Sequence, residues 1–317
     1  MSISKIKSLK VLSLLLFIAL SFNTHESNKD NDLTKMELKG KVKSLREITF
    51  EVEDKFGQIK KVKSVNDVEY FFDLKGNIIK EQKYNQKGVP DFIIKSEFDS
   101  KANRIKSKTI MINNFLSSKT IYGYDETNKL IHEKEYDSNG DINSKTLYSY
   151  SNDKLSEIVK YNYNKEDRKF EIWDKTTYEY NQYGLMSQEI YETFFLKQSI
   201  DKTDYLYNDK GKLIEKNYIN GSLREFDTKS QYVYNEKEEL IELRMYGNNE
   251  PWIEKYSYNQ GNLIELLIEK YKNAKLNETI LKNYSFDKNG NWINSKSFKN
   301  DIPIYLRERN IQYYVNK

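Results

Sequence analysis

The chain has 317 residues; 14% are aromatic, 32% are charged and none is cysteine. This composition excludes disulfides, thiolate metal sites and cysteine nucleophiles. The net charge is +4, of which three lysines before residue 11 supply +3. The remainder is nearly neutral, which argues against a nucleic-acid-binding protein, because such proteins usually carry a basic stripe.

The N-terminus has the pattern of a secretory signal, in which the three lysines precede the apolar run Val11–Leu20 and small residues follow. A run of about ten residues is too short to cross a bilayer of roughly 30 Å as a helix. We therefore expect a signal peptide at residues 1–21, no membrane span after its cleavage, and an exported protein in the periplasm, at the cell surface or secreted. Residues 22–34 are polar and aperiodic and predict a flexible leader.

Residues 35–317 form a single repeat domain in this interpretation, because a motif of tyrosine, any residue, an aromatic residue and Asp or Asn recurs along them. A weaker copy, SEFD, starts at Ser96. The second aromatic residue stands at positions 72, 98, 124, 150, 180, 207, 234, 258 and 286. The nearly constant spacing indicates one structural unit used about nine times.

The physics of one unit follows from the copy at Tyr122. Tyr122 and Tyr124 share one face of a strand, whereas Ile121 takes the other face, which is mostly polar in the other copies. Asp125 then begins a tight turn, and a return strand and a second turn complete the unit. Asn128 suits the positive φ of this turn, but its counterparts Ala102 and Glu238 fit poorly.

These units resemble the YD-repeat (Rhs-type) family, and YFFDLKGNII at Tyr70 and YSFDKNGNWI at Tyr284 are the best copies. The sequence predicts an all-β fold, an antiparallel β-meander of about nine 26–28-residue repeats that forms a curved sheet or a β-spiral. The segment from Lys39 is expected to open the array and IQYYVNK to close it. No segment keeps helical periodicity, and residues 262–272 are predicted to be a strand. The resemblance implies a hollow shell, which encloses a toxin in the large family members, and a toxin-associated role is one expectation.

The motif residues are predicted to be structural, since the acid is replaced by Asn in several copies, as a turn tolerates and an acid catalyst does not. His132 is expected on a solvated strand position, where other copies have Glu, and the fragment DSNGD at Asp137 lacks the spacing of a calcium loop. We therefore predict no catalytic residue, no metal site and no cofactor. The structural motif residues are Tyr122, Tyr124, Asp125, Tyr178, Tyr180, Tyr205, Tyr207, Tyr232, Tyr234, Tyr256, Tyr258, Tyr284 and Asp287.

Trp173 and Trp252 are the candidate ligand-binding residues, because they replace small polar residues near the hairpin tips. Local packing is the competing interpretation, and Trp173 lies in the longest repeat. Trp292 occupies an aliphatic position of the repeat and is expected in the core.

The sequence favours a non-catalytic binding or scaffold protein of the cell envelope, whose partner is a glycan or an envelope protein. A carbohydrate-active enzyme with a pair of carboxylates is the first alternative. An outer-membrane barrel is the second, although return strands such as LIHEKEY lack an uncharged row.

Overall fold

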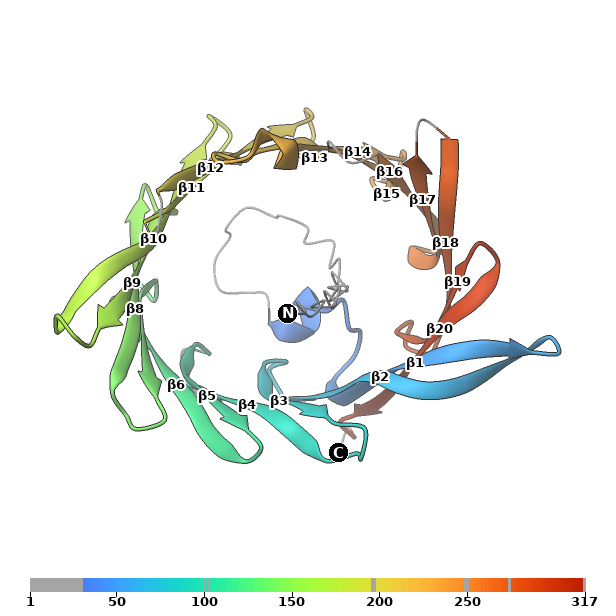
Figure 1. Cartoon of the computed structure of the whole chain (residues 1–317), viewed down its shortest axis with the longest axis horizontal. Coiled ribbons are helices and arrows are strands. Elements are labelled where there is room, and N and C mark those ends of the chain that lie inside the picture. The colour runs from blue at the N-terminus through green and yellow to red at the C-terminus, as the bar shows by residue number, and fades with distance from the viewer. Residues whose placement is uncertain are drawn as a thin grey trace, which may run out of the picture.

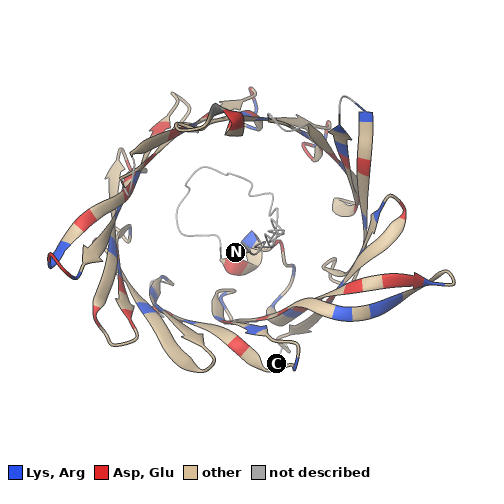
Figure 2. Ribbon diagram, in the orientation of Figure 1, with Lys and Arg blue, Asp and Glu red and all other residues tan. Residues whose placement is uncertain are grey.

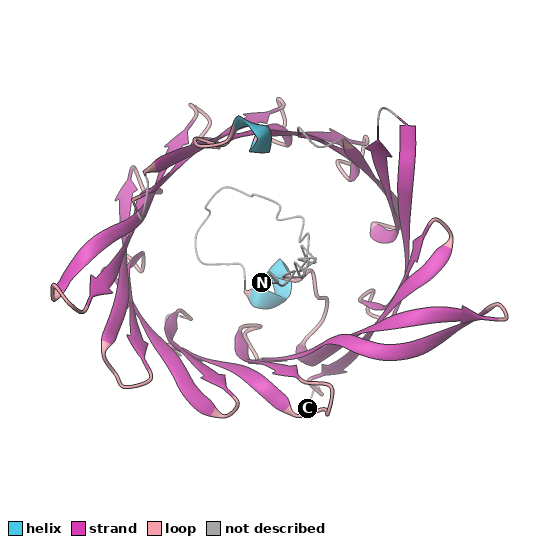
Figure 3. Cartoon of the chain, in the orientation of Figure 1, coloured by secondary structure: helices cyan, strands magenta, loops and turns pink. Residues whose placement is uncertain are grey.

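The computed structural model describes residues 31–99, 101, 103–194, 198–247, 251–272 and 275–315, so the predicted signal peptide and most of the predicted leader lie outside the described residues. The predicted all-β class is confirmed: within these described ranges, every element except two short helical segments is a strand (Figure 3). The predicted strand over residues 262–272 is β17. The elements are α1 Asp32–Lys35, β1 Val42–Lys55, β2 Gln58–Phe72, β3 Ile78–Tyr84, β4 Pro90–Phe98, β5 Ile105–Ile112, β6 Phe115–Tyr124, β7 Leu130–Asp137, β8 Ile142–Ser151, β9 Lys154–Asn164, β10 Lys169–Tyr180, β11 Met186–Thr193, β12 Ser199–Tyr207, β13 Leu213–Ile219, the 3₁₀ segment η1 Arg224–Phe226, β14 Thr228–Tyr234, β15 Leu240–Gly247, β16 Trp252–Asn259, β17 Asn262–Lys272, β18 Lys275–Phe286, β19 Trp292–Lys299 and β20 Ile302–Tyr313.

The strands form one 20-stranded sheet in which each strand pairs antiparallel with the next along the chain. The sheet closes into a ring because β1 pairs with both β2 and β20 (Figure 1). The prediction of an open curved sheet or a β-spiral was therefore wrong, because the sheet is a closed barrel. The segments expected to open and close the array pair with each other, which leaves neither as an unpaired edge.

The predicted turn after each motif is present. In the first copy, the Gly76 amide donates to the Asp73 carbonyl at 3.1 Å, and Gly76 has a φ of +86°. Asn128 and Glu238 occupy the same position with φ values of +66° and +63°. Asn tolerates this conformation, whereas Glu adopts it against its own preference, as the sequence predicts. Ala102 lies outside the described residues.

The tyrosine face of the sheet lines the lumen of the ring. Helix α1 lies inside the ring (Figure 1), and its Leu33 packs in the main apolar cluster with Leu45 and Phe72. Leu45 pairs with Tyr70 across β1 and β2, and Phe72 is two residues from Tyr70 on the same strand. Because side chains alternate between faces, the motif tyrosines in register with these residues also face inward.

The predicted boundary between leader and domain, after residue 34, falls inside α1. Asn31 caps the helix, since its side chain accepts from the Thr34 amide at 2.9 Å. The Leu33 amide donates to the Gly76 carbonyl at 3.0 Å. One buried leucine and these bonds fix residues 31–34 to the β2–β3 turn, although their composition is that of a flexible segment.

Candidate functional site

The motif acid holds the turn together. The carboxylate of Asp125 accepts from the backbone amides of Thr127 and Lys129, both at 2.9 Å. The Lys129 bond is the main cause that lowers the pKa of Asp125. Asn208 makes the equivalent bonds, to the amides of Lys210 at 3.0 Å and Lys212 at 2.9 Å. A single side-chain oxygen is sufficient for this role, which explains why Asp and Asn exchange between repeats.

The second tyrosine of the motif joins neighbouring hairpins in five of the copies. Its hydroxyl donates to a backbone carbonyl of the preceding hairpin, as from Tyr124 to Ile105 at 2.9 Å. The same bond recurs at Tyr150, Tyr180, Tyr234 and Tyr258, at 3.0, 2.8, 2.9 and 2.8 Å respectively.

The first tyrosine of each motif faces lumen carboxylates instead. Tyr148 donates to Glu133 at 2.8 Å and Tyr205 donates to Glu189 at 3.0 Å. Burial is the main cause that raises the pKa of both tyrosines, and the nearby carboxylates add to it. Burial likewise raises the pKa of Tyr178 to about 12. These hydroxyls therefore remain protonated hydrogen-bond donors at neutral pH.

A polar belt crosses the lumen wall from β7 to β10. Glu133 pairs with Thr146, Thr146 with Lys160, and Lys160 with Asp174, one residue on each strand. Burial raises the pKa of Asp174, and Lys160 partly offsets this effect. Glu135 also faces this belt and accepts from the Ser144 hydroxyl at 3.1 Å. The sequence pattern that indicates these inward carboxylates is their alternation with outward residues along the return strand, but they are not among the predicted site residues.

The structure does not bring the two candidate tryptophans together. Trp173 lies at a β-bulge of β10, whereas Trp252 begins β16, and β11–β15 separate the two strands. Both side chains are half-buried, and the Trp252 indole nitrogen is buried without a hydrogen-bond partner among the described residues. They cannot form one binding site, so the pair is retained only as two separate candidates.

Two other residues also depart from expectation. Trp292 is half-buried on the lumen face and not in the apolar core; the Arg309 guanidinium lies 3.4 Å from its ring centroid. His132 faces outward but is half-buried, because its ring covers Gly123, where an added Cβ would lie 2.1 Å from the His132 Cε1 atom. Within the described ranges, no cluster of three or more His, Asp or Glu side chains could hold a metal ion.

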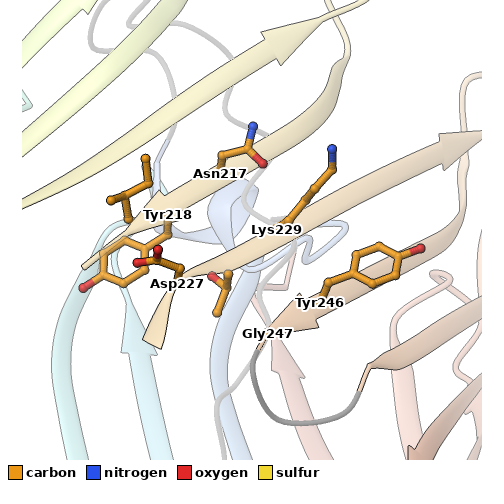
Figure 4. A pocket seen from close by; sticks show the side chains of 8 residues that line it. Asn217, Tyr218, Asp227, Lys229, Tyr246 and Gly247 are labelled. Carbon is orange, nitrogen blue, oxygen red and sulfur yellow. The ribbon is translucent and has the colours of Figure 1, made fainter. Parts of the chain in front are cut away.

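A shallow groove lies between β13, β14 and the end of β15 (Figure 4). Asn217 and Lys229 point to one side of the sheet and Tyr218 to the other. The Tyr218 hydroxyl is already engaged, since it donates to Asp201 at 2.6 Å. The groove therefore lacks the converging polar groups of a binding site.

No family model matches the chain, and no curated protein matches it. Among solved structures, it is similar to a TcdB2–TccC3–Cdc42 complex, with 11% identity, a TM-score of 0.38 and coverage of 85% of this chain but 16% of that one. It is also similar to a porin-like protein from Bacteroides uniformis, with 7% identity, a TM-score of 0.36 and coverage of 86% and 96%. The Photorhabdus luminescens Tc holotoxin pore follows, with 11% identity, a TM-score of 0.29 and coverage of 81% and 18%. Similarities this distant do not assign a function.

Proposed function

We propose that this chain is an exported, non-catalytic binding protein of the cell envelope whose lumen wall binds a glycan. The observation that carries the proposal is the repeated lumen pattern of tyrosines beside carboxylates, as at the half-buried Tyr148 with Glu133 and the buried Tyr205 with Glu189. Aromatic rings with polar edges offer stacking surfaces, and carboxylates accept hydrogen bonds from sugar hydroxyls. Because the pattern repeats around a ring, it suits an extended polymer better than one small molecule.

The side chains on the outer face of the ring support a location in water rather than in lipid. Acidic and basic residues are interspersed around the whole ring (Figure 2). Outward-facing ion pairs join Lys175 to Glu157 at 2.8 Å and Lys255 to Glu269 at 3.0 Å. A charged side chain that faces lipid at the bilayer midplane costs about 2–4 kcal/mol for Lys or Arg. This wall therefore does not favour the outer-membrane alternative. Among the described residues, no helix has the length and apolarity needed to span a membrane.

The enzyme alternative has less support. Glycosidases place two carboxyl groups about 5–9.5 Å apart, one with a raised pKa. Asp174 has the raised pKa, but its row partner Glu133 lies three strands away. At about 4.8 Å per strand, their backbones are roughly 14 Å apart, and Lys160 lies between them.

A glycan array probed with the full chain tests the proposal. We expect the variant Glu133→Gln with Glu135→Gln to bind at least about tenfold more weakly than wild type, because two lumen acceptors lose their charge. The matched control is Glu157→Gln with Glu179→Gln, which changes the outer face alone and should bind as wild type. The proposal fails if no glycan binds, or if the inner and outer variants bind equally well.

The tryptophan candidates have a separate test. Trp173→Ala and Trp252→Ala are made singly, because the structure separates them, and each is measured against the best array ligand. Weaker binding with an unchanged far-UV spectrum supports a contact at that residue. Unchanged binding by both variants leaves only local packing as their role.

A further inference from the structure

Lys282 departs from the residue type that five of the nine repeats share at its position; the neighbouring copy has Glu254 there. The residue two positions before the first motif tyrosine is Thr or Ser in five consecutive copies and lysine only at Lys282. The five are Thr120, Thr146, Thr176, Thr203 and Ser230. This position faces the lumen, so the ninth copy replaces a short hydroxyl side chain with a long cation. No requirement of the repeat itself explains this exchange.

The neighbouring strand presents two short, buried side chains beside Lys282. Lys282 on β18 pairs with Ser297 on β19, and Ser295 on β19 pairs with Arg307 on β20. Both serines are buried, with exposed fractions of 4% for Ser295 and 9% for Ser297. Two short side chains therefore form the floor between cations from the flanking strands, which lie about 10 Å apart. Long Lys and Arg side chains can converge over such a floor.

The cations here outnumber the carboxylates that face them. Glu47 serves two arginines: its carboxylate lies 2.8 Å from Arg309 Nε and 3.5 Å from Arg307 Nε. Lys282 has no hydrogen bond or ion pair with any residue that the structure describes. The carboxylate nearest to it in charge interaction is that of Glu254, which accepts a hydrogen bond from the Tyr256 hydroxyl. Burial and the nearby Arg307 both lower the pKa of Lys282, and Glu254 partly offsets them.

We propose that Lys282 and Arg307, above the floor of Ser295 and Ser297, form a lumen subsite for an oxyanion, the carboxylate, sulfate or phosphate group of an acidic ligand. Two cations and the Ser297 hydroxyl can surround the anion oxygens with charge-assisted hydrogen bonds, whereas the Ser295 hydroxyl bonds to Tyr284. The anion supplies the counter-charge that Lys282 lacks. The identification of the natural ligand as an acidic glycan rests on the proposed glycan-binding function. Binding of a free oxyanion to this subsite does not depend on that function.

The test uses the full chain and inorganic sulfate and phosphate as probes. Thermal unfolding and titration calorimetry are run against sodium chloride of equal ionic strength. Wild type should gain stability specifically from sulfate or phosphate, because a ligand of the folded state raises the unfolding midpoint. Lys282→Met should lose most of this gain, with affinity at least about tenfold weaker.

Lys216→Met is the matched control. Lys216 also faces the lumen and pairs with a serine, Ser230, and its ammonium lies 5.7 Å from the ring centroid of Tyr205. This control should keep the full anion response. The subsite is refuted if wild type responds to sulfate and phosphate only as it does to chloride, or if Lys282→Met responds like wild type. It is also refuted if the control loses as much as Lys282→Met.

The two proposals can fail separately. A uronate-containing oligosaccharide and its carboxyl-reduced, neutral counterpart are compared on wild type and Lys282→Met. A preference for the acidic sugar that disappears in the variant supports the subsite. If both sugars bind wild type and the variant alike, the glycan function stands and the subsite falls; if inorganic oxyanions bind but no glycan does, the subsite stands and the glycan function falls.

Discussion

Replacing Glu47 with glutamine should weaken the seam that closes the barrel. Glu47 on β1 accepts from Arg309 on β20 at 2.8 Å, across the only strand pair that joins the two ends of the described chain. The two side chains are 9% and 11% exposed. The glutamine side chain would keep a neutral acceptor for Arg309 but remove its buried counter-charge.

The size of the effect follows from this burial. Removing one partner of a buried ion pair costs about 3–5 kcal/mol, and the acceptor that glutamine retains reduces the expected loss to about 2–4 kcal/mol. Glu51 provides the control on the same strand: it pairs with Lys63 at 3.1 Å, but the two side chains are 40% and 55% exposed. Glu51→Gln should cost only about 0–1 kcal/mol.

Urea unfolding measures both variants, and amide hydrogen exchange locates the change. In Glu47→Gln, the amides of β1 and β20 should lose protection before those of β9 and β10. Equal free energies of unfolding for the two variants would refute the reasoning, as would a loss of protection spread evenly around the ring. A double-mutant cycle with Arg309→Met then separates the pair energy from the cost of a lone buried charge.

The remaining predictions concern the repeat. Asp125→Asn should have the same free energy of unfolding as wild type at neutral pH. Its free energy of unfolding should fall less than that of wild type when the pH is lowered. Because hydrogen bonds lower the pKa of Asp125 in the folded state, its contribution is present above the unfolded value of about 4 and is lost as the pH falls through the folded value. Denaturant midpoints between about pH 2 and pH 6 check this, and identical pH profiles for the two proteins would contradict it. Tyr124→Phe should cost about 0.5–1.5 kcal/mol in urea unfolding, because the Ile105 carbonyl loses its 2.9 Å partner. Tyr207→Phe, which removes a hydroxyl with no such bond among the described residues, should cost less, and the reverse order would count against this role.

Local chemistry made the repeat predictable. The alternation of Tyr122 and Tyr124 with Ile121 sets the buried face of a strand, because side chains alternate at a period of two. Asp125 and Asn128 fix the turn through their own side-chain bond and backbone preference. These interactions span a few residues, so their spacing in the sequence is enough to identify them.

The candidate site was only partly predictable. Lys282 differs from its counterparts in a way that an alignment of the repeats reveals, although it is not among the predicted site residues. Arg307 and Glu47 lie in the atypical terminal strands, where no repeat phase indicates which side chains face inward. The two tryptophans were singled out for their size, and the structure places them five intervening strands apart.

The sequence by itself determined the hairpin unit, its turns and the tyrosine face, because each depends on neighbours within one repeat. The tertiary structure alone decided that the sheet closes, that the tyrosines face a lumen and that Glu47 meets Arg309, 262 residues away. Closure depends on the twist and stagger summed over all 20 strands, a property of the whole sheet to which each repeat adds a small amount. No single repeat encodes that sum.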